Sequence, residues 1–270
     1  MPEREHAVDR STDGGGKSVG PPLRSPGLPS LIGNRAFRRL VARETAVEYP
    51  ERQAPAGGQT PGAAATLAEG IDYGWGNFDR EANALKKLGG TFVVRYLSHD
   101  TSKNLTRAEA EKWAAKGVSC VVVWESSTRR PTQGAQAGAA DATEAASQAR
   151  ACGQAETRPI YFAVDFDAKP EAVYDYFDGV ARAIGIERTG AYGGIRVIAG
   201  LFDTNRITYG WQTLAWSGGK WDPRAQLRQI DNDPQSNPRG YDRDRAVAGD
   251  FGQWYPVRQS TTAPVVPDAP

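Results

Sequence analysis

The sequence predicts an α/β protein with a TIM-like (β/α) barrel, on three observations. First, apolar segments rich in β-branched and aromatic residues alternate with helical segments from residue 66 to about 257, which is the pattern of a parallel sheet. Second, seven or eight such strands can be counted, and the later ones have poor helices between them. Third, no G-x-G-x-x-G or Walker A sequence follows the first strand, which disfavours an open nucleotide-binding sheet. We therefore expect a closed barrel, slightly irregular in its last strands.

The predicted strands are short apolar runs bounded by glycine or polar residues. In chain order they cover 70–74, 91–97, 118–125, 159–167, 188–194, 211–216 and 227–231. The runs 118–125 and 159–167 are almost continuously apolar, as expected of strands covered on both faces.

Helices are predicted between these strands. Asn77 is a plausible N-cap for a first helix, and Thr106 and Glu109 have the spacing of a capping box before a second. Residues 134–151 are rich in alanine, and Pro170 suits the first turn of a further helix. The two cysteines, Cys120 and Cys152, fall on a predicted strand and a predicted helix, so a disulfide framework is not indicated.

The chain divides into a loop-rich extension, a barrel and a tail. Residues 1–65 are rich in Gly and Pro and contain none of the seven Trp, so most of this extension is expected to be disordered, with a short helix near 30–44. The helix has an apolar face and four arginines, so it either docks on the main domain or folds in a partner's groove. The barrel is assigned to 66–257, and 258–270 is expected to be a flexible tail.

Composition excludes several classes of function. The chain has 33 Lys and Arg against 32 Asp and Glu, and this balance argues against a dedicated nucleic-acid binder. No apolar run is long enough to span a membrane, and two histidines are too few for a multi-histidine metal site. Residues 1–12 lack the apolar stretch of a secretory signal, so we expect a cytoplasmic protein or export by a non-classical machine.

Polar side chains gather at the predicted carboxyl ends of the strands, where a (β/α) barrel has its reactive face. The candidate catalytic residues are Asp72, Glu125, Asp165 and Asp167. The candidate substrate-binding residues are Arg95, Tyr96, Tyr192, Trp211, Gln212, Trp216, Gln229 and Asp231. Carboxyl groups beside aromatic rings are what a sugar-cleaving cleft requires, because the rings stack on pyranose faces while the carboxyl groups act as acid and as base or nucleophile.

Each candidate also has a structural interpretation. Asp72 fits a turn residue before a glycine, Asp167 fits the start of the next helix, and Glu125 is a possible ion-pair partner of Arg95. Tyr192 and Trp211 fit core aromatics, His99 a solvated loop residue, and the run 242–245 (DRDR) an ion-paired surface or loop. Asp165 is the hardest to explain structurally, because it lies inside an apolar run.

Several of these segments also resemble a known family. GIDYGWGNF, FVVRYLS, GAQAGAADATEAASQA, RPIYFAVDFDA and GAYGG, in this order over residues 66–256, are similar to the DUF1906 family of glycoside-hydrolase-like domains, which is related to the GH25 muramidases. The resemblance implies a TIM-like barrel. It also implies that Asp72 corresponds to the family's strand-one Asp, and that Asp165 corresponds to the Asp of its strand-four Asp-x-Glu motif.

Asp167 stands where that motif has the glutamate that acts as general acid. An aspartate reaches roughly 1–1.5 Å less far, and a misplacement of this order costs about 10²-fold in rate. The resemblance implies hydrolysis of a β-1,4 bond in peptidoglycan without a cofactor or a metal. Asp167 or Glu125 would be the acid. Asp165 would orient the N-acetyl group or stabilise the transition state.

Two other functions stay open at this point. One is a glycan-binding or envelope-associated module that does not cut. The other is a cargo of a contractile injection system, because the segment GNRAFRRL resembles a short helix found near the start of proteins associated with such systems. In that case residues 30–44 would dock on the machine and the barrel would be the payload.

Overall fold

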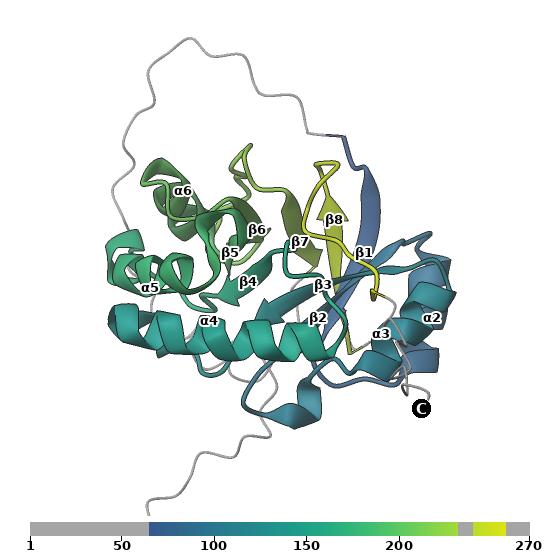
Figure 1. The fold of residues 1–270 in the computed structure, drawn as a ribbon. Helices are drawn as coiled ribbons and strands as arrows, with labels where there is room; N and C mark the ends of the chain where they lie inside the picture. The colour runs from purple at the N-terminus through teal and green to yellow at the C-terminus, as the bar shows by residue number, and fades with distance from the viewer. Residues whose placement is uncertain (1–64, 232–239, 258–270) are drawn as a thin grey trace, which may run out of the picture.

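The computed structural model describes residues 65–231 and 240–257 and forms a closed eight-stranded barrel with its strands in chain order (Figure 1). The strands are β1 (Ala68–Tyr73), β2 (Phe92–Leu97), β3 (Ser119–Trp124), β4 (Ile160–Ala163), β5 (Thr189–Gly193), β6 (Tyr209–Thr213), β7 (Leu227–Asp231) and β8 (Asp242–Ala246). Strands β1 to β7 pair in parallel, whereas β8 closes the barrel antiparallel to both β7 and β1. The predicted TIM-like barrel with irregular last strands is confirmed.

The helices follow the first five strands. They are α2 (Phe78–Lys87), α3 (Arg107–Ala115), α4 (Gly134–Ala151), α5 (Tyr174–Ile184) and α6 (Ile195–Asp203), with short 3₁₀ turns η1 (Thr101–Lys103), η2 (Arg130–Thr132), η3 (Pro170–Ala172) and η4 (Ile186–Arg188). The segment between β6 and β7 contains turns and no helix. Within the described ranges, no helix is both long and apolar enough to cross a lipid bilayer. The predicted extension 1–65, with its helix at 30–44, lies outside the described residues except for position 65, as does the tail 258–270.

Local side-chain chemistry explains where the helices begin. Asn77 caps α2 as predicted, because its Oδ1 accepts from the backbone N–H groups of Asp79 and Arg80. Thr106 caps α3 through a bond from the Glu109 N–H. The reciprocal half of the predicted capping box does not form, because the Glu109 carboxylate bonds Arg95 and Tyr73 instead.

The barrel separates two apolar cores, and strand alternation assigns residues to them. On β2, Phe92, Val94 and Tyr96 belong to the inner cluster, whereas Val93 and Leu97 pack in the outer cluster beneath the helices. The same alternation on the other strands decides which polar side chains face the barrel interior. Cys120 and Cys152 are free and buried, and burial raises the pKa of both thiols, that of Cys152 to about 11.

Two predicted segments differ from the structure. Strand β4 ends at Ala163, and only the Val164 N–H continues its bonding, to Tyr192 O (2.8 Å), so Asp165 follows the strand. The run 242–245 was expected on the surface or in a loop, but it is strand β8. Arg243 and Arg245 do form ion pairs with Glu69 of β1, whereas Asp244 between them is completely buried.

Helices α4 and α5 lie side by side (Figure 1), and two glycines allow their backbones to touch. A Cβ atom on Gly138 would lie 1.9 Å from Tyr176 O, and one on Gly179 would lie 2.0 Å from Ala135 O. Both obstacles are helix backbone, which cannot move without shifting the whole helix.

We predict that Gly138→Ala destabilises the protein despite the better helix propensity of alanine. Overpacking costs about 1–3 kcal/mol or more, against a gain of about 1 kcal/mol in propensity. Urea unfolding measures the change, with Gly249→Ala as the control, because a Cβ at Gly249 meets no atom within 4 Å. A Gly138→Ala variant as stable as the unchanged protein would contradict this account of the helix contact.

Candidate active site

Asp72 lies at the centre of a polar network inside the barrel. It belongs to β1, and the residue is 3% exposed. Its Oδ1 accepts from the Tyr96 hydroxyl of β2 (3.3 Å), and its Oδ2 accepts from Nε2 of Gln229 on β7 (2.7 Å). The two donors fix the carboxyl plane, so Asp72 is held by the barrel rather than by a turn.

Gln229 links Asp72 to the opposite side of the barrel. Its Oε1 accepts from the hydroxyl of Tyr192 on β5 (2.9 Å) and from Oγ1 of Thr213 on β6 (2.9 Å). The Tyr192 ring packs on Trp211 with centroids 4.5 Å apart. The structure therefore brings together five residues that were predicted separately from the sequence, and these are Asp72, Tyr96, Tyr192, Trp211 and Gln229.

Asp244 of β8 belongs to this cluster, and sequence reasoning missed it. Trp211 Nε1 donates to Asp244 Oδ1 (2.8 Å), and Asp244 lies on the strand adjacent to that of Asp72. Burial, followed by the nearby Asp72 and Asp242 carboxyl groups, raises the pKa of Asp244 well above its ordinary value. The signal in the sequence was the alternation of Asp and Arg over 242–245 followed by Ala246, a period of two that fits a strand with acidic residues inward.

Glu125 directly follows β3 and is paired with a lysine. The carboxylate lies 3.4 Å from Lys103 Nζ, and both side chains are about one-tenth exposed. Lys103 Nζ also lies 5.1 Å from the centroid of the Tyr96 ring, so the ion pair borders the Asp72 cluster. The interpretation that Arg95 neutralises Glu125 is wrong, because Lys103 of η1 takes this role; its place in a polar loop gave no sequence signal.

Asp165 lies just beyond β4 and is 7% exposed. Its neighbours Val164 and Phe166 pack in the outer core. By alternation Asp165 belongs to the interior side, in line with Tyr161 and Ala163.

Asp167 lies farther from the strand and is ion-paired. Its Oδ1 is 2.5 Å from Arg196 of α6, and the carboxyl side chain is 34% exposed. A general acid has to hydrogen-bond to the substrate oxygen that it protonates, whereas Asp167 Oδ1 is bonded to Arg196. Asp167 can therefore act as the proton donor only if it separates from Arg196.

Four other predicted residues lie outside the Asp72 network. Arg95 faces outward and bonds Glu109 of α3 (2.6 Å). Gln212 also faces outward and holds the β6–β7 segment through Ser217, Lys220 and the Asp222 N–H. Trp216 is half-buried in that segment with a φ of 56°, and Asp231 is half-buried at a register irregularity between β7 and β8.

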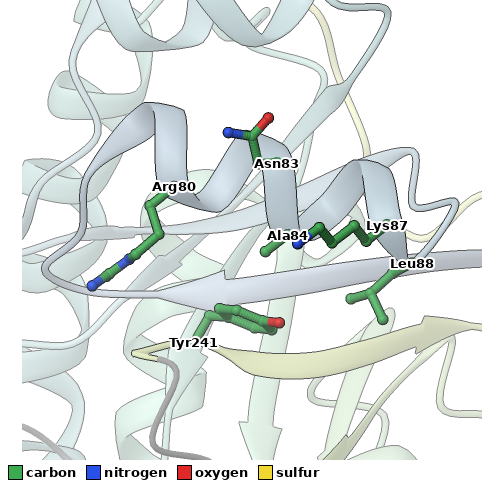
Figure 2. A pocket seen from close by; sticks show the side chains of 6 residues that line it. All are labelled: Arg80, Asn83, Ala84, Lys87, Leu88 and Tyr241. Atoms are coloured by element: carbon green, nitrogen blue, oxygen red, sulfur yellow. The ribbon is translucent and has the colours of Figure 1, made fainter.

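A separate pocket lies on the side of the barrel. It has a volume of 560 Å³ and lies between α2 and the residue before β8. Figure 2 shows the Tyr241 ring beneath Ala84 and Leu88, with Arg80 and Lys87 along the same helix. None of the predicted site residues lines it. Within the described part of the chain, no group of three His, Cys, Asp or Glu side chains is placed to hold a metal ion.

Comparison with known proteins gives a family match and several structural likenesses. The family model described as Rv2525c-like, glycoside hydrolase-like domain matches residues 83–247, which include Glu125, Asp165 and Asp244 and begin after Asp72. None of the curated proteins matches the chain. Nothing in these comparisons supports the predicted relation to contractile injection systems.

Among solved structures, the Tat-secreted protein Rv2525c of Mycobacterium tuberculosis is 24% identical, with a TM-score of 0.64 over 70% of this chain and 100% of that one. A protein of B. stearothermophilus is 15% identical, with a TM-score of 0.52 over 66% of this chain and 95% of that one. A glycosyl hydrolase 25 of Streptococcus pneumoniae is 15% identical, with a TM-score of 0.44 over 67% and 87%. The first two likenesses show a shared fold.

Proposed function

The chain belongs to the Rv2525c-like, glycoside hydrolase-like family, which is the DUF1906 family that its motifs predict, and from this premise we propose that it hydrolyses a β-1,4 glycosidic bond in peptidoglycan. One observation carries the proposal. Asp72, Glu125 and Asp165 stand at or just after the carboxyl ends of β1, β3 and β4, which parallel pairing brings to one end of the barrel. This is the end at which (β/α) barrels carry out their chemistry.

Asp165 is the charged residue of the proposed reaction. It orients the substrate's N-acetyl group for attack on the anomeric carbon or stabilises the oxocarbenium-like transition state. Asp72 binds the sugar, and the donors Tyr96 and Gln229 keep its carboxylate in place. Because both donors come from the barrel wall, this geometry exists before substrate arrives, which reduces the cost of reorganisation.

Asp167 is the proposed proton donor, and Arg196 controls it. The Asp167–Arg196 bond (2.5 Å) has to open before Asp167 can bond a glycosidic oxygen. The pair is about one-third exposed, so an incoming sugar can displace the guanidinium. Glu125 is the second proposed donor, and Lys103 restrains it in the same way.

Aromatic side chains near the strand ends provide the proposed sugar contacts. Tyr192 and Trp211 are buried and support the carboxyl groups from below. Trp75, in the loop after β1, is 43% exposed, and its indole N–H donates to Ser102 Oγ (2.9 Å), which fixes the ring. Trp75 offers an exposed ring face on which a pyranose ring can stack, and the half-buried Trp216, after β6, is a second proposed sugar contact.

Incubation of the full chain with purified peptidoglycan tests the proposal. The expected result is the release of reducing ends, and the fragment masses should show N-acetylmuramic acid at the reducing end. Intact peptidoglycan after prolonged incubation, at several pH values and enzyme concentrations, would contradict hydrolysis.

Binding without cleavage is the second candidate function, and the Asp167–Arg196 pair favours it. It predicts that the chain co-sediments with peptidoglycan while no reducing ends appear. In that case Arg196→Met, which frees Asp167, would still give no turnover.

A further inference from the structure

Asp72 and Asp244 lie on adjacent strands with their side chains inside the barrel. In the antiparallel β1–β8 pair, Asp244 is opposite Gly70, and Asp72 is opposite Asp242. The Phe92 ring of β2 packs against Gly70, and Asp244 and Asp72 are diagonal neighbours on the inner face of this pair. On its other side Asp244 is opposite Gln229, which bonds Asp72. The Asp72 carboxyl group is close enough for its charge to act on Asp244.

Asp244 is enclosed inside the barrel, away from bulk solvent. Its exposure is 0%, and that of Asp72 is 3%. Its neighbours on β8, Arg243 and Arg245, point to the outer face and pair with Glu69. Among the described residues, no Lys or Arg forms a salt bridge with Asp244.

The distribution of hydrogen-bond donors distinguishes the two carboxyl groups. Asp72 accepts a bond on each oxygen, from Tyr96 and from Gln229. Asp244 accepts one bond, from Trp211, on Oδ1, and no donor in the described part of the chain reaches its Oδ2. Two buried carboxylates this close together cannot both be charged, so one of them carries a proton. Asp244 Oδ2, which accepts no hydrogen bond, is the oxygen to which we assign this proton.

We propose that Asp244 is a protonated carboxylic acid at neutral pH and that its Oδ2–H group donates to Asp72, which positions Asp72 as a carboxylate at the barrel end. Asp244 is thus a positioning residue, and this role in catalysis rests on the proposed function. The protonation state of Asp244 does not depend on that function.

Other ionisable groups surround the pair. Asp242 is on β8 itself, Tyr96 faces the pair from β2, and Tyr192 lies beyond Gln229 on β5. Glu125 with Lys103, and Asp165, follow the ends of β3 and β4. Asp242 adds negative charge, which makes a second charge on Asp244 still less favourable.

The pH dependence of stability tests the proposal through Asp244→Asn. The amide keeps a neutral donor toward Asp72 and an acceptor for Trp211, but it does not titrate. A raised pKa in the folded state gives stability that is complete below the ordinary aspartate pKa of about 3.9 and is lost as pH rises toward the folded-state pKa. Relative to Asp244→Asn, the unfolding equilibrium constant of the unchanged protein should therefore rise nearly tenfold per pH unit between about pH 5 and 7.

Asp175→Asn, at an exposed position of α5, is the matched control and should follow the unchanged protein. Parallel pH profiles for Asp244→Asn and the unchanged protein would overturn the proposal. Infrared spectroscopy provides a test that needs no variant. With ¹³C-labelled aspartate, the unchanged protein at pH 7 should show the shifted carbonyl band of a protonated carboxyl group, and its absence would also overturn the proposal.

Activity separates this inference from the proposed function. If the unchanged protein does not cleave peptidoglycan, the proposed function fails. The pH profile of stability and the infrared band still show whether Asp244 is protonated. If it cleaves, Asp244→Leu should lose more activity than Asp244→Asn, because only the amide retains a donor. Equal losses would overturn the positioning role.

Discussion

Asp165→Asn is expected to lower the rate of reducing-end release from peptidoglycan by about 10²–10⁴-fold. The amide keeps the shape of the side chain but removes the charge that would act at the anomeric carbon. Asp165 follows β4 and is 7% exposed, so solvent screens a charge on its carboxylate only weakly. Initial rates across a range of peptidoglycan concentrations measure the effect, which should fall mainly on kcat.

The stability of the Asp165→Asn variant has to be checked in parallel. Its unfolding midpoint should match that of the unchanged protein, and its peptidoglycan binding should persist. Asp175→Asn, an exposed change on α5, serves as the activity control. Asp167→Asn should also abolish cleavage if Asp167 donates the proton. Full activity in both the Asp165 and Asp167 variants would remove the catalytic assignment altogether.

The barrel could be predicted because its strands follow simple patterns. Continuous apolar runs identified β3 and β4, and the 134–151 helix was correct to the residue because alanine dominates it. Strand β8 was missed for a physical reason. Its residues are almost all charged, and its two arginines pair with Glu69, which lies on a strand more than 170 positions earlier.

The candidate site was predicted only in part, because several of its residues have bonding partners that the sequence does not reveal. Position near a strand end suggested Asp72 and Tyr96, and the structure places both on the inner face. For Arg95 and Gln212, position near a strand end suggested the site, yet alternation turns both outward. The pairing of Asp167 with Arg196 and of Glu125 with Lys103 depends on loop conformations that no local pattern specifies.

Arg95 stabilises the fold between β2 and α3, where it is enclosed. It is 4% exposed, and its guanidinium bonds both oxygens of Glu109 (2.6 and 3.2 Å) as well as Tyr73 O and Gly74 O. The Tyr73 hydroxyl donates to the same Glu109 carboxylate (2.7 Å). Burial works to raise the pKa of Glu109, but the bonds and charge of Arg95, with the Tyr73 and Trp113 donors, more than offset this and lower it.

Arg95→Met should therefore destabilise the protein by about 3–5 kcal/mol at pH 7, because it leaves the Glu109 carboxylate buried without its cation. Arg150→Met is the control, since Arg150 and Glu156 form an exposed pair worth about 0–1 kcal/mol. The pH dependence identifies the cause. A lowered pKa gives stability that is present above the ordinary glutamate pKa of about 4.3 and is lost as pH falls, so the gap between the unchanged protein and Arg95→Met should narrow below about pH 4.5. If the difference in stability stays constant from pH 7 to pH 3.5, the loss comes from packing of the arginine stem and not from the ion pair. If Arg95→Met leaves the unfolding midpoint unchanged but raises the KM for peptidoglycan, Arg95 is a substrate-binding residue.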